Sequence, residues 1–255
     1  MKKNFFYYGR SLGLTLLALV ILSMLPLSAG ADTPRQVYVL TATGSINPGL
    51  AEFILDGIQT AEKAKAEALV IELDTPGGLD TAMREITQGI INAKIPVVVF
   101  VAPKGARAAS AGLMITLASH VAAMAPGTNI GAAHPVAIGS QKMDKTMSSK
   151  VVNDMAAYVR SLAAERDRNA EWAEKAVRQS VSISAQEALK LKVVEVMADD
   201  VPDLLKKIDG RVVRLNQVSR TLKTGQAQVV PITPGLRHRV LKQLADPNIA
   251  IILMM

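Results

Sequence analysis

Residues Lys104 to His134 read KGARAASAGLMITLASHVAAMAPGTNIGAAH, and this stretch places a serine between a strand and a buried helix. The apolar run 96–101 predicts the strand, and the run 111–117 predicts the helix. Small residues on both sides of Ser110 allow a sharp turn and the close approach of another chain. At the first turn of a helix, free N–H groups and the helix dipole favour a developing negative charge. The pattern is typical of a presented nucleophile, although Ser110 could also simply cap the helix.

Composition limits the kind of site that the chain can build. Of its 255 residues, 49% are hydrophobic and 20% are charged, which suits a globular core with membrane-associated ends. Without cysteine there is no disulfide, thiolate nucleophile or zinc–thiolate site. The histidines, His120, His134 and His238, are too scattered to indicate a metal cage. We therefore expect no metal and no cofactor.

The N-terminal segment, residues 1–31, has the organisation of a signal peptide. Lys2, Lys3 and Arg10 precede an apolar run that ends in Ala29-Gly30-Ala31, a small-x-small cleavage site. An uncleaved membrane anchor is the alternative. In either case we expect the rest of the chain on the extracytoplasmic face, associated with the membrane. Nucleic-acid binding is not expected, because the net charge of +7 forms no basic stripe and aromatic residues are few.

From residue 37 to residue 196 apolar strands alternate with amphipathic helices, which predicts an α/β fold with parallel strands covered on both faces. The expected strands are 37–40, 68–73, 96–101, 120–124 and 193–196, and the expected helices are 48–65, 79–93, 111–117, 151–166, 171–179, 185–191 and 202–208. Ligands bind beyond the carboxyl ends of such strands. The loops 74–78 and 105–110 both follow strands, so we expect them to meet at one edge of the sheet.

The loop Asp74-Thr75-Pro76-Gly77-Gly78 supplies the second half of the predicted site. Gly77 and Gly78 leave backbone N–H groups free to face an oxyanion, with no side chain in the way. A plain strand-to-helix turn is the alternative. A Walker-type phosphate loop is excluded, because no Lys-Ser/Thr pair follows the glycines. With Ala111, the two glycines are the expected oxyanion donors.

Three motifs together resemble the NfeD (nodulation-efficiency) family of membrane-bound serine proteases, in the Clp-peptidase/crotonase superfamily. They are LDTPGG at 73–78, AASAG at 108–112 and APGTNIGAAHP at 125–135, and the resemblance covers roughly residues 37–196. It implies a ClpP/crotonase-like spiral of ββα units and a Ser–Lys dyad. It also implies cleavage of hydrophobic segments, with a stomatin-like membrane protein as substrate or partner. We further expect a homodimer.

The general base has two candidates. The family pattern places it at Lys150, just before the helix expected at 151–166, and a lysine acts as a base only when neutral. Lys142 and Lys145 lie in the same polar stretch and are rivals of Lys150 in principle. His134 is the rival, as in Clp-type Ser-His-Asp peptidases. We prefer Lys150 because no third triad member is evident among Asp144, Asp154 and Asp167.

We expect a protease domain over 32–200, an extended tail or small β extension over 201–236, and a juxtamembrane segment over 237–255 that begins a possible transmembrane helix. Three functions remain open. The chain is a membrane-associated serine endopeptidase, a crotonase-type acyl-thioester enzyme, or a non-catalytic scaffold for a stomatin-like partner. An exported location away from coenzyme A argues against the second. We favour the endopeptidase.

Overall fold

The structure is a computed structural model that describes residues 35–136, 144–215, 218–235 and 237–238. The expected signal peptide and nearly all of the expected juxtamembrane segment lie outside these residues. Across the described part of the chain, no helix is both long and apolar enough to cross a membrane.

Six parallel strands form the main sheet, in the order β11-β1-β2-β3-β5-β8. Ile71 in the middle of β2 lies opposite Leu40 of β1 and Val99 of β3. The central strands are buried on both faces, as their continuous apolar runs predict. The strands are β1 (Gln36–Thr43), β2 (Ala68–Asp74), β3 (Val97–Val101), β5 (Val121–Met124), β8 (Val196–Met197) and β11 (Gln228–Ile232).

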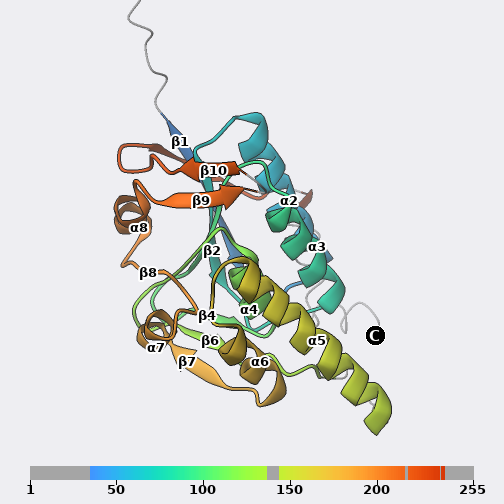
Figure 1. Ribbon diagram of the computed structural model, residues 1–255. Helices are drawn as coiled ribbons and strands as arrows, with labels where there is room; N and C mark the ends of the chain where they lie inside the picture. The colour runs from blue at the N-terminus through green and yellow to red at the C-terminus, as the bar shows by residue number, and fades with distance from the viewer. Residues whose placement is uncertain (1–34, 137–143, 216–217, 236, 239–255) are drawn as a thin grey trace, which may run out of the picture. The chain divides into compact units, whose positions relative to one another are not determined.

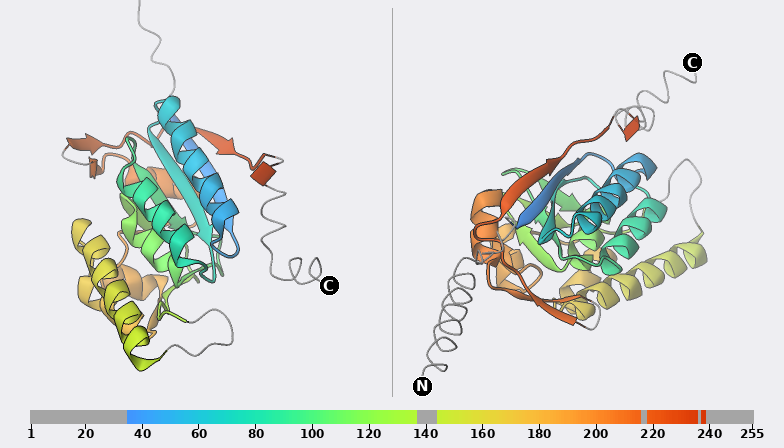
Figure 2. Two further views of the ribbon diagram at one scale, coloured as in Figure 1. Left: turned by 90° about the vertical axis from the view of Figure 1, so that its right-hand side faces the viewer. Right: turned by 90° about the horizontal axis from the view of Figure 1, so that it is seen from above.

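Alternate side chains of the sheet enter two hydrophobic cores. One core joins the sheet to six helices, which are α2 (Pro48–Lys63), α3 (Asp80–Ile91), α4 (Ala111–Ala118), α5 (Lys145–Glu165), α6 (Ala170–Arg178) and α7 (Ala185–Lys190). The other core holds Phe100 and packs against α8 (Val201–Ile208) and β9 (Val212–Leu215). Figure 1 shows α2 and α3 on one side of the sheet and α8 on the other, and the left view of Figure 2 looks onto the α2–α3 layer. The expected α/β fold is therefore confirmed.

Two small sheets complete the fold. One contains β4 (Arg107–Ala109), β6 (Asn129–Gly131) and β7 (Ser182–Ser184), and the other pairs β9 with β10 (Val218–Thr221). The strands of the first are only three residues long, too short to show an alternating pattern. α7 (Ala185–Lys190) begins with a capping box of Ser184 and Glu187.

Two segments differ from expectation. α5 begins at Lys145 because the Asp144 side chain accepts a hydrogen bond from the Met147 N–H at 2.8 Å, so Lys150 lies inside the helix and not before it. The expected extension 201–236 contains the β9–β10 pair, but β11 joins the main sheet beside β1. The end of that segment is thus part of the same core fold.

Arginine side chains bind the carboxyl end of α4. Arg168 Nη1 donates to the carbonyl of Leu117 at 2.6 Å, and its Nε donates to Glu195 at 2.6 Å. Arg166 Nε donates to the carbonyl of Ala118 at 3.3 Å. These cations satisfy the last carbonyls of the helix whose first turn follows Ser110.

We expect His120 to make the protein sensitive to acid. Its Nδ1 accepts a hydrogen bond from the Val97 N–H, and burial, then the charges of Arg166 and Arg168, lower its pKa to about 3 from the ordinary 6.5. Below pH 6.5 the unfolded chain takes up a proton that the folded chain does not, so stability falls as pH falls. The loss approaches about 1.4 kcal/mol per pH unit. Urea unfolding of wild type and His120→Asn between pH 7 and pH 4 measures this loss of stability. If both proteins lost equal stability, His120 would not be the source of the acid sensitivity.

Candidate active site

Ser110 stands in a strained turn between β4 and α4. Its backbone has φ 53° and ψ −116°, and its N–H donates to the Gly131 carbonyl at 2.9 Å. Few residues other than glycine adopt a positive φ, and such outliers gather at functional sites. The Ser110 side chain makes no capping hydrogen bond to α4. The hydroxyl is therefore available for chemistry and not engaged in holding the helix.

The two predicted loops meet at the carboxyl edge of the sheet. The Thr75 N–H donates a hydrogen bond to the backbone carbonyl of Arg107 at 2.8 Å, and the Ala109 N–H donates one to the backbone carbonyl of Thr75 at 3.1 Å. A Cβ atom on Gly77, whose φ is +115°, would lie 2.6 Å from the Ser110 Cβ. Only glycine fits there, because its loop backbone contacts the serine directly.

The expected oxyanion donors differ in their availability. The Gly77 N–H donates to the Thr75 hydroxyl at 3.0 Å, so it is already engaged. Within the described residues, the N–H groups of Gly78 and Ala111 have no hydrogen-bond acceptor. Ala111 is the first residue of α4, where the helix dipole adds to the donor strength. The sequence alone does not reveal that Gly77, one of the three expected oxyanion donors, already donates its N–H to the Thr75 hydroxyl.

Ser110 and Lys150 line the same cavity, whose volume is about 450 Å³. Most of its wall is apolar, and its polar members besides the pair are Asp80, Arg84 and Asp154. A mainly apolar cleft with a few convergent polar groups is typical of a ligand site. The apolar side chains that line it are Met83, Ala111, Met114, Ala133, Pro135, Val136, Val151 and Met155.

Arg84 links α3 to the part of α5 that carries Lys150. Its Nη2 contacts Asp154 at 2.5 Å, its Nε contacts Asp80 at 2.9 Å, and its guanidinium lies 4.5 Å from the Tyr158 ring centroid. The buried residues of α5 begin only at Met155. The Arg84 contacts therefore help to hold the exposed first half of the helix beside Ser110. Nothing in the sequence around Arg84 indicates this function.

His134 makes a different contact. Its Nδ1 lies 2.9 Å from the Val177 carbonyl, which can only accept, so Nδ1 carries the proton. His134 is not among the residues lining the Ser110 cavity. The possible third triad members are engaged as well, since Asp144 caps α5 and Asp154 pairs with Arg84. Asp167 pairs with Arg214 at 3.1 Å.

Of the rival lysines, Lys145 is the exposed first residue of α5, and Lys142 lies outside the described residues. The surroundings of Lys150 are partly apolar. Val151 lines the cavity and Val152 packs against the core, but Met147 is 50% exposed.

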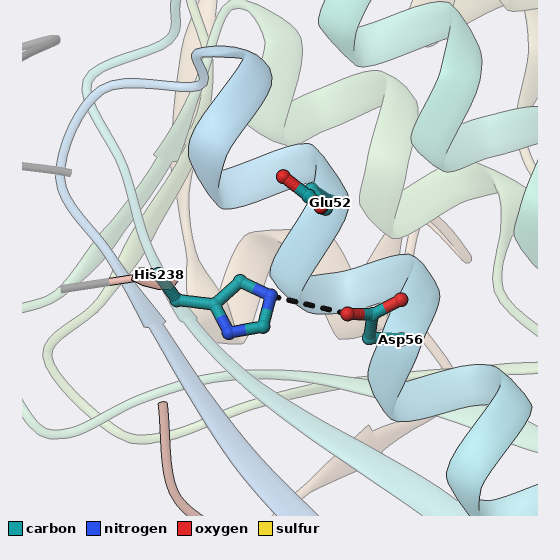
Figure 3. Close-up of side chains that lie close together, drawn as sticks. All are labelled: Glu52, Asp56 and His238. Carbon is teal, nitrogen blue, oxygen red and sulfur yellow. Dashed lines mark hydrogen bonds and ion pairs between the residues drawn. The ribbon is translucent and has the colours of Figure 1, made fainter. Parts of the chain in front are cut away.

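The fold brings the third histidine to two carboxylates of α2 (Figure 3). His238 Nε2 lies 3.1 Å from Asp56, and Arg237 Nη2 lies 2.6 Å from Glu52. The His238 ring also contacts Phe53 edge-on, at 5.4 Å between centroids. Each carboxylate thus already has a basic partner, and these contacts hold residues 237–238 against α2.

Comparisons with known proteins show the family of the chain. The family model described as "NfeD1b, N-terminal domain" matches residues 36–232. The membrane-bound protease PH1510 of Pyrococcus horikoshii is 40% identical over 222 residues, which are 86% of this chain and 50% of that protein. The membrane protein NfeD1b of Bacillus subtilis is 29% identical over 203 residues, covering 76% of this chain and 46% of that protein. The chain thus spans about half the length of the curated relatives that it matches.

Solved structures extend the comparison. The 1510-N membrane-bound stomatin-specific protease, as a lysine-to-alanine mutant with a substrate peptide, has a TM-score of 0.78 and 39% identity, covering 84% of this chain and 99% of that chain. Its serine-to-alanine mutant has a TM-score of 0.75 and 41% identity, covering 79% and 99%. ClpP1 of Listeria monocytogenes shares the fold at a TM-score of 0.53 and 21% identity, covering 64% and 91%. The predicted ClpP-like fold is confirmed.

Proposed function

The chain belongs to the family of the NfeD1b N-terminal domain, and from this we propose that it is a membrane-associated serine endopeptidase that uses Ser110 as nucleophile and Lys150 as general base. The observation that carries the proposal is the single cavity lined by both residues, with Ser110 in a strained turn and its hydroxyl free of any capping bond. The relative with a solved structure is named as a protease, and its mutants replace a serine and a lysine.

The reaction follows from the arrangement of these groups. The neutral amine of Lys150 accepts the hydroxyl proton as Ser110 Oγ attacks the peptide carbonyl. The N–H groups of Gly78 and Ala111 donate to the oxyanion, while the N–H of Gly77 holds the loop through Thr75. Lys150 returns the proton to the departing amine. A water then loses its proton to Lys150 and attacks the acyl-enzyme, and Ser110 is released with its proton restored.

The substrate itself completes the site. Lys150 is exposed, whereas a lysine base works in a dry environment that disfavours its ammonium form. An apolar peptide segment lying along Met83, Met114 and Met155 would cover the amine and exclude water. The apolar wall thus favours hydrophobic segments as substrates.

We propose a stomatin-like membrane protein as substrate or partner, since the 1510-N relative is named as stomatin-specific. We further propose that the chain lies on the extracytoplasmic face of the membrane and forms a homodimer. Sedimentation velocity would measure its oligomeric state.

Covalent labelling tests the nucleophile directly. We expect a fluorophosphonate to modify Ser110 and no other serine, as read by mass spectrometry of tryptic peptides, and to stop cleavage of a hydrophobic stomatin-derived peptide in parallel. Ser119 is a suitable internal control, because its hydroxyl is buried and bonded to two carbonyls. Failure of the wild type to cleave or to be labelled would favour the scaffold function instead.

A further inference from the structure

A second cavity, of about 400 Å³, lies near the amino ends of β3 and β5, whereas the Ser110 loop follows the carboxyl end of β3. Four cationic side chains line it, and we call it the arginine pocket: Arg166, Lys192, Arg211 and Arg214. They come from the end of α5, the turn after α7, and β9 with its preceding residue. No step of the proposed proteolysis uses this pocket.

The arginine pocket has an excess of positive charge. Three acids also line it, and two of them are paired, Asp167 with Arg214 at 3.1 Å and Glu195 with the adjacent Arg168 at 2.6 Å. Among the described residues, Arg166, Lys192 and Arg211 form no ion pair. The remaining acid, Glu165, cannot balance three cations, so the pocket has room for an anionic ligand.

Arg166 is the clearest sign of a missing counter-ion. It is half-buried, and within the part of the chain that the structure describes its guanidinium donates only to the carbonyls of Ala118 and Arg214, at 3.3 and 3.2 Å. Burial, and then repulsion from Arg168, lower the pKa of Arg166, whereas the charges of Glu165 and Glu195 act in the opposite direction. Removing a cation from water without a direct ion pair is costly, and an anion in the pocket would relieve that cost.

His120 supplies a second, independent observation on the inner wall of the pocket. Its Nδ1 accepts the Val97 N–H at 3.1 Å, so the proton of the neutral ring is on Nε2. The residue is only 8% exposed, and its Nε2 has no hydrogen-bond partner among the described residues. Buried donors are nearly always satisfied, so an unpartnered one beside a cationic cavity points to an absent acceptor.

We propose that the arginine pocket binds a small phosphate-type oxyanion, held by Arg166, Lys192 and Arg211, with the His120 ring turning slightly to donate to it. Three unpaired cations from separate elements suit a multivalent, tetrahedral anion better than a single carboxylate. The cavity is large enough for a small phosphate ester as well as for inorganic phosphate.

This site lies at the far end of the helix that begins at the serine. Arg166 and Arg168 bind the last carbonyls of α4, and Ser110 immediately precedes the first residue of that helix. The inference does not depend on protease activity, and binding can be measured on an inactive Ser110→Ala protein.

The experiment is a calorimetric titration of the full chain with sodium phosphate, at constant ionic strength maintained with chloride. The double variant Lys192→Gln/Arg211→Gln is expected to bind phosphate at least about tenfold more weakly, because two charge-assisted contacts are lost. Within the described residues, the side chains of Lys192 and Arg211 form no hydrogen bond or ion pair, so replacing them disturbs the fold less than replacing Arg166. Lys190→Gln, an exposed neighbour outside the pocket, is the matched control and should bind like wild type.

Three further measurements identify the source of the phosphate and locate it. If glycerol 3-phosphate binds more tightly than inorganic phosphate, the site is assigned to phosphate esters. Comparing binding to vesicles of phosphatidic acid with binding to vesicles of phosphatidylcholine distinguishes a lipid headgroup from a free ester. Phosphate should also shift the His120 ring resonances in a ¹H–¹⁵N spectrum of wild type but not of the double variant. Absence of phosphate binding, or equal weakening by Lys190→Gln, would overturn the proposal.

Discussion

Ser110→Ala and Lys150→Ala are each expected to reduce cleavage of a hydrophobic stomatin-derived peptide by at least about 10⁴-fold, because nucleophile and base act as one unit. His134→Ala is expected to stay within about tenfold of wild type, since His134 is bonded to Val177 and does not line the cavity. Initial rates under kcat/KM conditions provide the measurement, with circular dichroism to verify folding.

Lys145→Ala is the matched control for Lys150→Ala. Both lysines are exposed on the first part of α5, but only Lys150 lines the Ser110 cavity. We therefore expect Lys145→Ala to retain nearly full activity. Loss of activity in His134→Ala with survival of Lys150→Ala would instead establish a Clp-like triad with histidine as the base.

Gly78→Ala is expected to lower the free energy of unfolding by about 3 kcal/mol or more, because overpacking against backbone cannot relax cheaply. A Cβ atom there would lie 2.1 Å from the carbonyl oxygen and 2.6 Å from the nitrogen of Ile46. That contact is fixed by two hydrogen bonds, each 2.8 Å long. The Ile46 N–H donates to the Gly77 carbonyl, and the Leu79 N–H donates to the Ile46 carbonyl. Chemical denaturation at pH 7 measures the loss.

Gly235→Ala serves as the reference for that substitution. A Cβ on Gly235 would meet nothing closer than His238 Nδ1 at 3.9 Å, so its effect should stay within about 0.5 kcal/mol. If Gly78→Ala were as stable as Gly235→Ala, the close packing of the glycine loop on Ile46 would be wrong. Where Gly78→Ala remains folded at low temperature, its cleavage rate should still fall, because the oxyanion donor has moved.

The main sheet and its loops were predictable because their signals are local. Continuous apolar runs mark β2 and β3 as strands buried on both faces, and small residues around Ser110 mark a sharp turn before a helix. The parallel arrangement then brings the Gly77–Gly78 loop to the serine, since both loops follow the carboxyl ends of neighbouring strands. Strand β11 was harder to predict, because its partner β1 is almost two hundred residues away in sequence.

By itself, the sequence determined the α/β class, the small-residue turn at Ser110 and the glycine loop, since periodicity and turn chemistry act over a few residues. Only the tertiary structure decided which of the candidate bases lines the same cavity as Ser110, and that the Gly77 N–H donates to the hydroxyl of Thr75. The start of α5 depends on the Asp144 cap. That Arg166 lacks an ion pair and His120 Nε2 lacks a hydrogen-bond partner among the described residues becomes visible only once distant elements meet. Charge pairing and hydrogen-bond satisfaction are set by contacts in space, which no local pattern records.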